Sequence, residues 1–132
     1  MLDTQAWIWS VLDHPRLSRR VRAVLAAVPA PERIGLAAIS LKEAAWHLAH
    51  GRIRVNEDFG PWTLWLRRAA SSPHLEVLPL TVDVVIESER LGSSFPPDPA
   101  DCLIAATARV HDLTLVTSDA AIRKSRAVRT LW

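Results

Sequence analysis

Apolar positions along the chain change repeatedly between strand-like and helical spacing. Strand-like runs cover 34–39, 75–80 and 113–117, with a short start at 1–3 and an edge strand at 128–132. Helical spacing predicts helices at 4–12, 19–28, 41–50, 59–70, 81–91 and 99–110, and one more helical turn after 119. Strands that alternate with helices favour an α/β fold of three layers, with a mostly parallel sheet flanked by helices.

Short local signals support several of these element boundaries. Ser18 is expected to cap the helix that follows it, and Asp98-Pro99 supplies an N-cap and a first-turn proline for the helix to about 110. The residues Ser40 to Glu43 match a capping box, which predicts a helix start there, and Gly51 is the expected stop of that helix.

Composition narrows the class of protein. With 132 residues, 49% of them hydrophobic and 23% charged, the chain is expected to form a single globular domain over 1–132. No apolar run approaches the roughly 20 residues of a membrane span, and the first ten residues lack the features of a signal peptide. The sequence therefore predicts a cytoplasmic protein with no membrane partner. The single cysteine, Cys102, excludes an internal disulfide and is expected to pack as a small apolar residue.

Four acidic residues lie at the ends of predicted strands or at the starts of predicted helices. In open parallel α/β sheets, functional groups gather beyond the carboxyl ends of strands and at the starts of the following helices. Asp3 ends the first predicted strand, Glu43 lies in the helix after the second, and Asp119 follows the strand 113–117. Asp101 lies in the first helical turn after Asp98, and Asp98 is close enough to it to act as a second-tier ligand. All of these acids are expected at one rim of the sheet.

Four gathered carboxylates favour a bound cation. Each like-charged pair about 4 Å apart costs roughly 4 kcal/mol at an effective dielectric near 20, and a divalent ion offsets this repulsion. Oxygen ligands without cysteine favour Mg²⁺ or Mn²⁺, which can promote in-line attack on a phosphodiester. Helix capping is an alternative explanation for Glu43, Asp98 and Asp119, whereas Asp3, within a strand, has no expected capping role.

Aromatic and neutral polar residues offer weaker signals. The tryptophans lie at helical spacing and are expected to pack rather than to stack RNA bases, with part of Trp7, Trp9 and Trp46 left as a groove for a partner helix. His47 and His50 are three residues apart on one predicted helix, but a metal site there lacks a third ligand. Thr117 and Ser118 flank Asp119 and either support the metal site or only end the strand.

Several of these segments together resemble the PIN-domain proteins, in particular the VapC-type toxins. The resemblance covers nearly the whole chain and is carried by LDT at 2–4, AISLKEAAWHLAHGRI at 38–53, LEVLPLT at 75–81, DPADCLIAATARVHDLTLVTSD at 98–119, and the closing VRTLW. The block from 98 to 119 is the most specific part. Relatives carry a few more residues before the first acid, whereas only two precede Asp3, so the first strand is expected to be short.

The resemblance implies an activity, a cofactor and partners. It assigns Asp3, Glu43, Asp101 and Asp119 to the family's acidic quartet and Asp98 to an additional acid of the DPxD variant. It implies RNA cleavage with Mg²⁺ or Mn²⁺, inhibition by a small antitoxin protein, and a homodimer.

Two other functions remain as alternatives. A catalytically inactive PIN-like module that binds only RNA or a protein would keep the fold without the reaction. A receiver-like signalling domain also gathers acids around Mg²⁺, but such domains carry an acidic pair after the first strand and a lysine after the fifth, and neither is found here.

Overall fold

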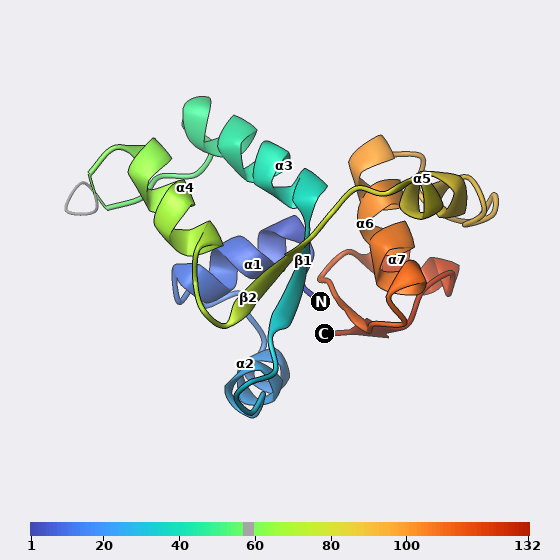
Figure 1. Ribbon diagram of the computed structural model, residues 1–132, viewed down its shortest axis with the longest axis horizontal. Helices are drawn as coiled ribbons and strands as arrows, with labels where there is room; N and C mark the ends of the chain where they lie inside the picture. The colour runs from blue at the N-terminus through green and yellow to red at the C-terminus, as the bar shows by residue number, and fades with distance from the viewer. Residues whose placement is uncertain (57–59) are drawn as a thin grey trace.

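A computed structural model describes residues 1–56 and 60–132 of the chain. Its elements are α1 (Thr4–Val11), α2 (Arg19–Ala26), β1 (Ile34–Ala37), α3 (Ala38–Ala49), α4 (Trp62–Ala70), β2 (Leu75–Leu78), α5 (Val82–Ser88), α6 (Pro99–Val110), β3 (Leu115–Val116), α7 (Ala120–Ser125) and β4 (Thr130–Leu131). The strands run through the middle, with α1, α3 and α4 on one side and α5, α6 and α7 on the other (Figure 1). The predicted three-layer α/β arrangement is confirmed. The expected helix start at Phe59 lies outside the described residues.

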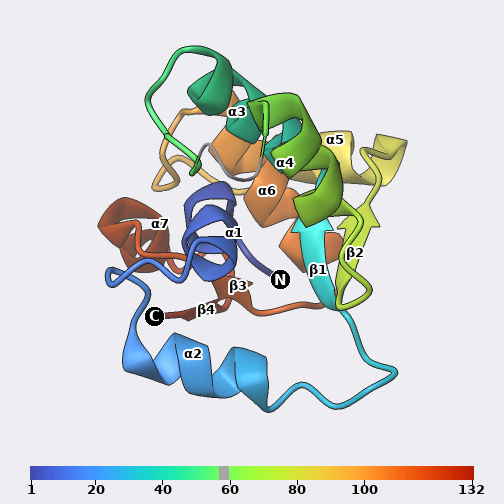
Figure 2. The same cartoon turned by 90° about the vertical axis from the view of Figure 1, so that its left-hand side faces the viewer.

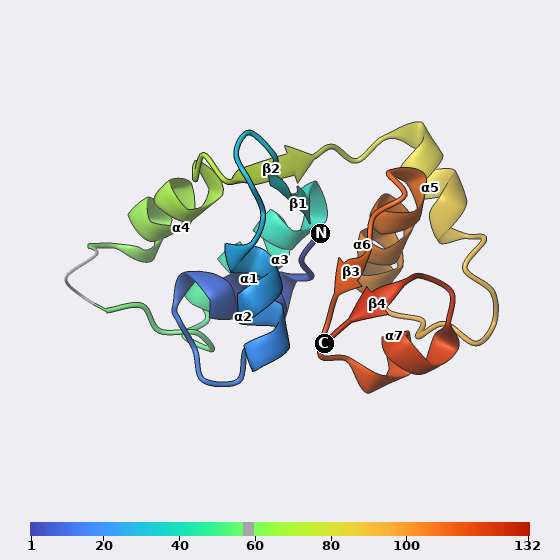
Figure 3. The same cartoon turned by 90° about the horizontal axis from the view of Figure 1, so that it is seen from below.

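The N-terminus joins two pairs of parallel strands into one sheet. β1 pairs with β2 and β3 pairs with β4, while Leu2 forms parallel bridges to both Leu36 and Val116. The Leu2 N–H donates to the Gly35 carbonyl at 2.9 Å, and the Val116 N–H donates to the Met1 carbonyl at 2.8 Å. The strand expected at 1–3 is therefore a single bridging residue, and both chain ends lie near the middle of the molecule (Figure 3).

Side chains that alternate along the strands build a separate core on each face of the sheet. Leu2, Leu36 and Val116 belong to the cluster that includes Trp7 of α1 and Val21 of α2. Their chain neighbours Met1, Ala37 and Leu115 belong to the cluster on the other face, with Ile104 of α6 and Ile122 of α7. Because successive residues of a strand point to opposite faces, the short apolar strands serve both cores. Figure 2 shows α1 and α2 against the strands on the first of these faces.

Most predicted helix caps are confirmed, but the capping box is wrong. The Ser18 side chain accepts from the Val21 N–H, Asp98 caps α6, and Gly51 follows α3 with a positive φ of 64°. However, β1 passes directly into α3 at Ala38, so Ser40 lies inside the helix rather than before it. The buried Ser40 hydroxyl has no hydrogen-bond partner among the described residues.

Exposed apolar side chains concentrate on α5 and the segment before it. Leu80, Val82, Val85 and Ile86 are all exposed, Val82 to 75%. They line one side of a short helix whose buried residue is Val84. This apolar face has nothing packed over it among the described residues, which is typical of a contact surface.

Across residues 1–56 and 60–132, no helix is both long enough and apolar enough to cross a membrane.

Candidate active site

The four acids that the sequence singled out line one cavity of about 610 Å³. Asp3 follows the bridging residue Leu2, and Asp119 follows β3, so both stand at carboxyl ends of neighbouring parallel strands. Glu43 projects from α3, which begins directly after β1, and Asp101 lies in the first turn of α6. Elements far apart in the sequence thus bring these carboxylates to the same rim of the sheet.

Asp3 is buried and held from two directions. Its Oδ1 accepts from the Ala6 N–H at 2.6 Å, and the Thr117 hydroxyl forms a hydrogen bond with the same carboxylate. The pKa of Asp3 is raised to about 6, mainly by burial and in addition by the charges of Glu43 and Asp119, while the two hydrogen bonds act in the opposite direction. The expectation that Asp3 has no capping role is wrong, because it is the N-cap of α1.

Glu43 is held by a residue from another helix. Its Oε2 accepts from the Thr4 hydroxyl at 2.5 Å, across 39 positions of sequence. Because α3 begins at Ala38, Glu43 lies beyond its first turn, and the capping explanation of this acid no longer applies. Sequence reasoning missed Thr4 as a site residue, although it directly follows Asp3 in the LDT motif.

Asp119 and Asp98 both cap helices, as the alternative explanation proposed. Oδ1 of Asp119 accepts from the Ala121 and Ile122 N–H groups at 2.7 and 2.9 Å, which leaves the other oxygen out of these bonds. The buried Thr117 hydroxyl accepts from the Asp119 N–H at 3.0 Å, so Thr117 contacts two acids of the cavity. Asp98 caps α6 and is not among the residues that line the cavity.

The pKa of Asp101 is raised by burial and by the charges of all the other candidate acids. Its pKa is raised to about 6, first by burial and then by the charges of Asp98, Glu43, Asp119 and Asp3, in that order. Its carboxylate takes part in none of the hydrogen bonds and salt bridges seen among the described residues. Asp101 is therefore the acid with the most freedom to adjust its position.

The donor set fits a hard divalent cation, although the carboxylates do not form a closed cage. Within residues 1–56 and 60–132, no three His, Cys, Asp or Glu side chains stand close enough together to hold a metal ion directly. Like charges without a cation between them are expected to keep apart. Four carboxylates line one cavity, and their charges contribute to the raised pKa values of Asp3 and Asp101. This donor set is chemically suited to Mg²⁺ or Mn²⁺.

The same cavity is also lined by basic and aromatic residues, which sequence reasoning did not anticipate. Trp9, His14 and Arg16 come from α1 and the segment after it, and Arg52 and Arg54 come from the segment after α3. His47 also lines this cavity. Its predicted partner His50 instead places Nδ1 2.8 Å from the Trp46 carbonyl, with its ring 4.7 Å from that indole.

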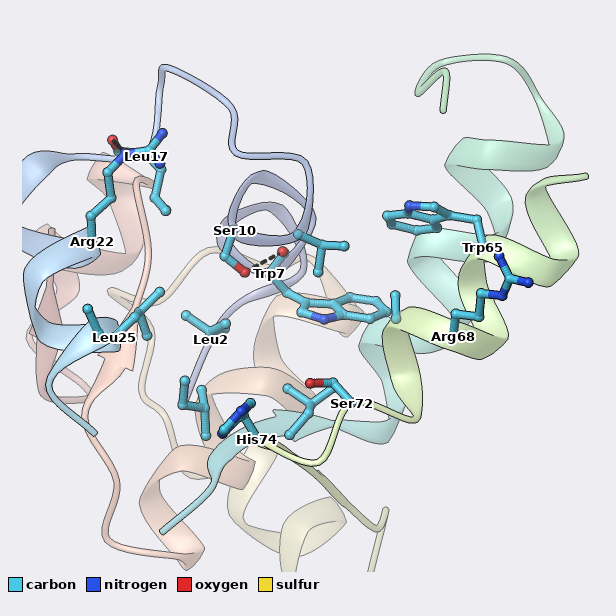
Figure 4. A pocket seen from close by; sticks show the side chains of 15 residues that line it. Leu2, Trp7, Ser10, Leu17, Arg22, Leu25, Trp65, Arg68, Ser72 and His74 are labelled. Atoms are coloured by element: carbon cyan, nitrogen blue, oxygen red, sulfur yellow. Dashed lines mark hydrogen bonds between the residues drawn. The ribbon is translucent and has the colours of Figure 1, made fainter. Parts of the chain in front are cut away.

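A larger and more apolar cavity of about 740 Å³ lies between α1, α2 and α4 (Figure 4). Trp7 and Trp65 form part of its wall, with ring centroids 6.3 Å apart. No aspartate or glutamate of the described residues lines it, so the acid chemistry belongs to the smaller cavity. Trp7 is only 1% exposed, so the expectation that it leaves surface for a partner is wrong, whereas Trp46 is exposed as expected.

Comparisons with known proteins agree on one family. The PIN domain family matches residues 1–127. Ribonuclease VapC22 of Mycobacterium tuberculosis is 36% identical over 134 residues, which span all of this chain and 97% of the relative. Among solved structures, VapBC2 of Rickettsia felis bound to promoter DNA superposes with a TM-score of 0.73 at 18% identity, covering 99% of this chain and 96% of that one. FitAcB of Neisseria gonorrhoeae superposes with a TM-score of 0.72 at 26% identity, covering 99% and 95%.

Proposed function

The chain belongs to the PIN-domain family, and from that premise we propose that it is an endoribonuclease that uses Mg²⁺ or Mn²⁺ and acts as the toxin of a toxin–antitoxin pair. The observation that carries the proposal is the convergence of Asp3, Glu43, Asp101 and Asp119 on one cavity. The whole-length similarity to a ribonuclease supports RNA as the substrate.

Three of the four proposed metal ligands are positioned before a metal binds. The Ala6 N–H and the Thr117 hydroxyl hold Asp3, and the Thr4 hydroxyl holds Glu43. The first N–H groups of α7 hold Oδ1 of Asp119. Asp101 has no such restraint among the described residues and can move to complete the ligand set. This arrangement gives a defined site with one adjustable member.

The reaction proposed at this site is hydrolysis of a phosphodiester. A water oxygen bonds to phosphorus, the phosphorus–oxygen bond to the neighbouring nucleoside breaks, and the proton that the water loses is balanced by a proton taken up by the leaving oxygen. When bound, the divalent ion would supply positive charge that neutralises the carboxylates and stabilises the charge developing on the phosphate. The carboxylates would hold that ion at the rim of the sheet. Thr117 keeps Asp3 and Asp119 in register with each other.

Cleavage assays with matched variants test this proposal. Purified protein freed of its partner should cleave RNA with added Mn²⁺ or Mg²⁺ and stop when EDTA is added. Asp101→Asn should abolish most activity, whereas Asp83→Asn, an exposed acid in the first turn of α5, should leave it unchanged. Activity that survives EDTA would contradict the metal mechanism. Metal-independent RNA binding without cleavage would instead favour the inactive PIN-like module.

The apolar cavity between α1, α2 and α4 is the proposed seat of the inhibitory antitoxin. Two of the solved structures that the chain resembles are VapBC2 of Rickettsia felis and VapBC-1 of nontypeable Haemophilus influenzae. The cavity offers apolar side chains that a partner helix can bury. Leu25 lines the cavity, whereas Val24, its neighbour on α2, is exposed and does not. Leu25→Glu should therefore prevent binding of the antitoxin, and Val24→Glu should not.

Co-expression of the protein with the small open reading frame immediately upstream of its gene tests the antitoxin proposal. The measurements are growth of the cells, co-purification of the two proteins and nuclease activity of the complex. A neighbour that neither binds nor suppresses cleavage would contradict the toxin assignment even if RNA cleavage itself is observed.

A further inference from the structure

The lining of the candidate active site holds charges of both signs. Beside the four acids, Arg16, Arg52 and Arg54 bring positive charge to the same cavity. None of these three arginines takes part in the salt bridges found among the described residues. Arg52 is held in place by Trp46, whose ring centroid lies 4.5 Å from the guanidinium carbon. Arginines that line a phosphodiester site are suited to bind the neighbouring phosphates.

Two stacked rings line the same cavity. The indole of Trp9 and the imidazole of His14 have centroids 5.6 Å apart and planes only 15° from parallel. Two backbone contacts fix the pair: the His14 N–H donates to the Trp9 carbonyl at 2.9 Å, and the Arg16 N–H donates to Nδ1 of His14 at 3.2 Å. The rings therefore keep their orientation without a ligand.

The imidazole is the member of this pair that remains available. Trp9 packs against Trp132 as well as against His14, and the ring centroids of Trp9 and Trp132 lie 5.7 Å apart. Among the described residues, the Trp9 indole is the ring that contacts His14, and the His14 side chain is half-buried at the cavity wall. A flat π-system can thus extend the stack from His14 into the cavity.

We propose that His14, backed by Trp9, stacks a nucleobase of single-stranded RNA beside the cleaved phosphodiester, while Arg16, Arg52 and Arg54 hold adjacent phosphates. This inference rests on the proposed ribonuclease function and assigns its substrate contacts. A base can reach the imidazole only when it is unstacked from its neighbours, so the site selects single-stranded segments or loops. A cavity of about 610 Å³ is large enough for a nucleotide.

The test compares three variants on intact and base-deleted RNA. His14→Ala removes the stacking ring, His14→Phe keeps a flat ring, and His111→Ala is the control, an exposed histidine outside both cavities. A labelled oligonucleotide is paired with a series in which one position at a time is abasic. Cleavage with Mn²⁺ gives KM and kcat, and fluorescence anisotropy in EDTA gives Kd.

His14→Ala should raise KM and Kd for intact RNA about tenfold, with kcat within about twofold of wild type. His14→Phe should restore binding, and His111→Ala should match wild type. For one position of the series, the abasic RNA should bind wild type about tenfold more weakly than intact RNA does. His14→Ala should bind that abasic RNA no more weakly than wild type binds it. Wild-type binding by His14→Ala, an equal loss on every abasic RNA, or no RNA binding by wild type would overturn the inference.

The two proposals fail separately. Wild-type protein that shows the His14-dependent binding pattern but cleaves no RNA with Mn²⁺ would contradict the ribonuclease function and leave the base contact standing. Wild-type protein that cleaves RNA without any dependence on His14 would contradict only the base contact.

Discussion

Replacing Asp3 with asparagine should stabilise the metal-free protein near neutral pH and remove its metal-dependent activity. Asp3 is 9% exposed, and burial, followed by the charges of Glu43 and Asp119, raises its pKa from 3.8 to about 6. Since one pKa unit corresponds to about 1.4 kcal/mol, the ionised carboxylate costs the folded state on the order of 3 kcal/mol. Asparagine has no charge and caps helices as well as aspartate, so the Ala6 N–H keeps its acceptor.

The pH dependence follows from where the proton is held. Between about pH 4 and pH 6 the folded protein keeps a proton on Asp3 that the unfolded chain has lost. The free energy of unfolding therefore falls as pH rises through this window and is lowest above about pH 6. The raised pKa of Asp101 acts in the same direction. Asp3→Asn should remove the contribution of Asp3 to the pH dependence of the free energy of unfolding, because asparagine does not titrate.

The net gain should be smaller than the full electrostatic cost. The buried asparagine amide must be desolvated and must pair with the Thr117 hydroxyl in place of the carboxylate oxygen. We expect the free energy of unfolding to rise by about 1–2 kcal/mol near pH 7.5 and to change little near pH 4.

Urea unfolding of EDTA-treated protein near pH 4.5 and pH 7.5 measures this directly. Asp83→Asn, which changes an exposed acid in the first turn of α5, is the control and should leave both values unchanged. Added Mn²⁺ should raise the melting temperature of wild type but not of Asp3→Asn. If Asp3→Asn were destabilised by the same amount at both pH values, the charge of Asp3 would not be the cause of its cost.

Three further predictions concern the hydrogen bond of Glu43, the second-tier acid and the apolar face of α5. Thr4→Val, which deletes the donor to Glu43, should weaken Mn²⁺ binding about 10–100-fold in a melting-temperature titration, and unchanged affinity would argue against its positioning role. Asp98→Asn should lower cleavage less than Asp101→Asn, because Asp98 lies outside the cavity lining; equal losses in kcat would contradict this order. We expect wild type to be a homodimer through α5, so light scattering should give Val85→Asp, but not wild type, a mass near 14.7 kDa.

Local signals allowed much of the fold to be predicted. The alternation of strand-like and helical spacing placed β1, β2, α5 and α6 within a few residues of their observed bounds. The N-caps Ser18 and Asp98 were correct because a cap depends on contacts three residues away at most. The capping box at Ser40 failed for a non-local reason: β1 leads into α3 without a connecting turn, so the helix starts earlier than the motif predicts.

The acids were predictable as residues, but their environment was not. Asp3, Asp101 and Asp119 could be placed at a strand end or helix start from the sequence, whereas Glu43 lies beyond the first turn of α3, where the sequence had not placed it. The N-cap role of Asp3 is a local contact with Ala6 that its assignment to a strand obscured. That Thr4 rather than a capping box holds Glu43 depends on how α1 packs beside α3. Their proposed role as metal ligands remains a prediction that the variants above test.

The sequence by itself determined the order of elements, the three-layer class and the acids available for chemistry, because spacing and capping act over a few neighbouring residues. Only the tertiary structure decided which side chains share a cavity. The parallel sheet joined through Leu2 brings Asp3 beside Thr117 and Asp119, and the segments after α1 and α3 place His14 and Arg52 in the lining of the same cavity. Such contacts join residues up to more than a hundred positions apart, and they are fixed by burial of the two cores rather than by any local pattern.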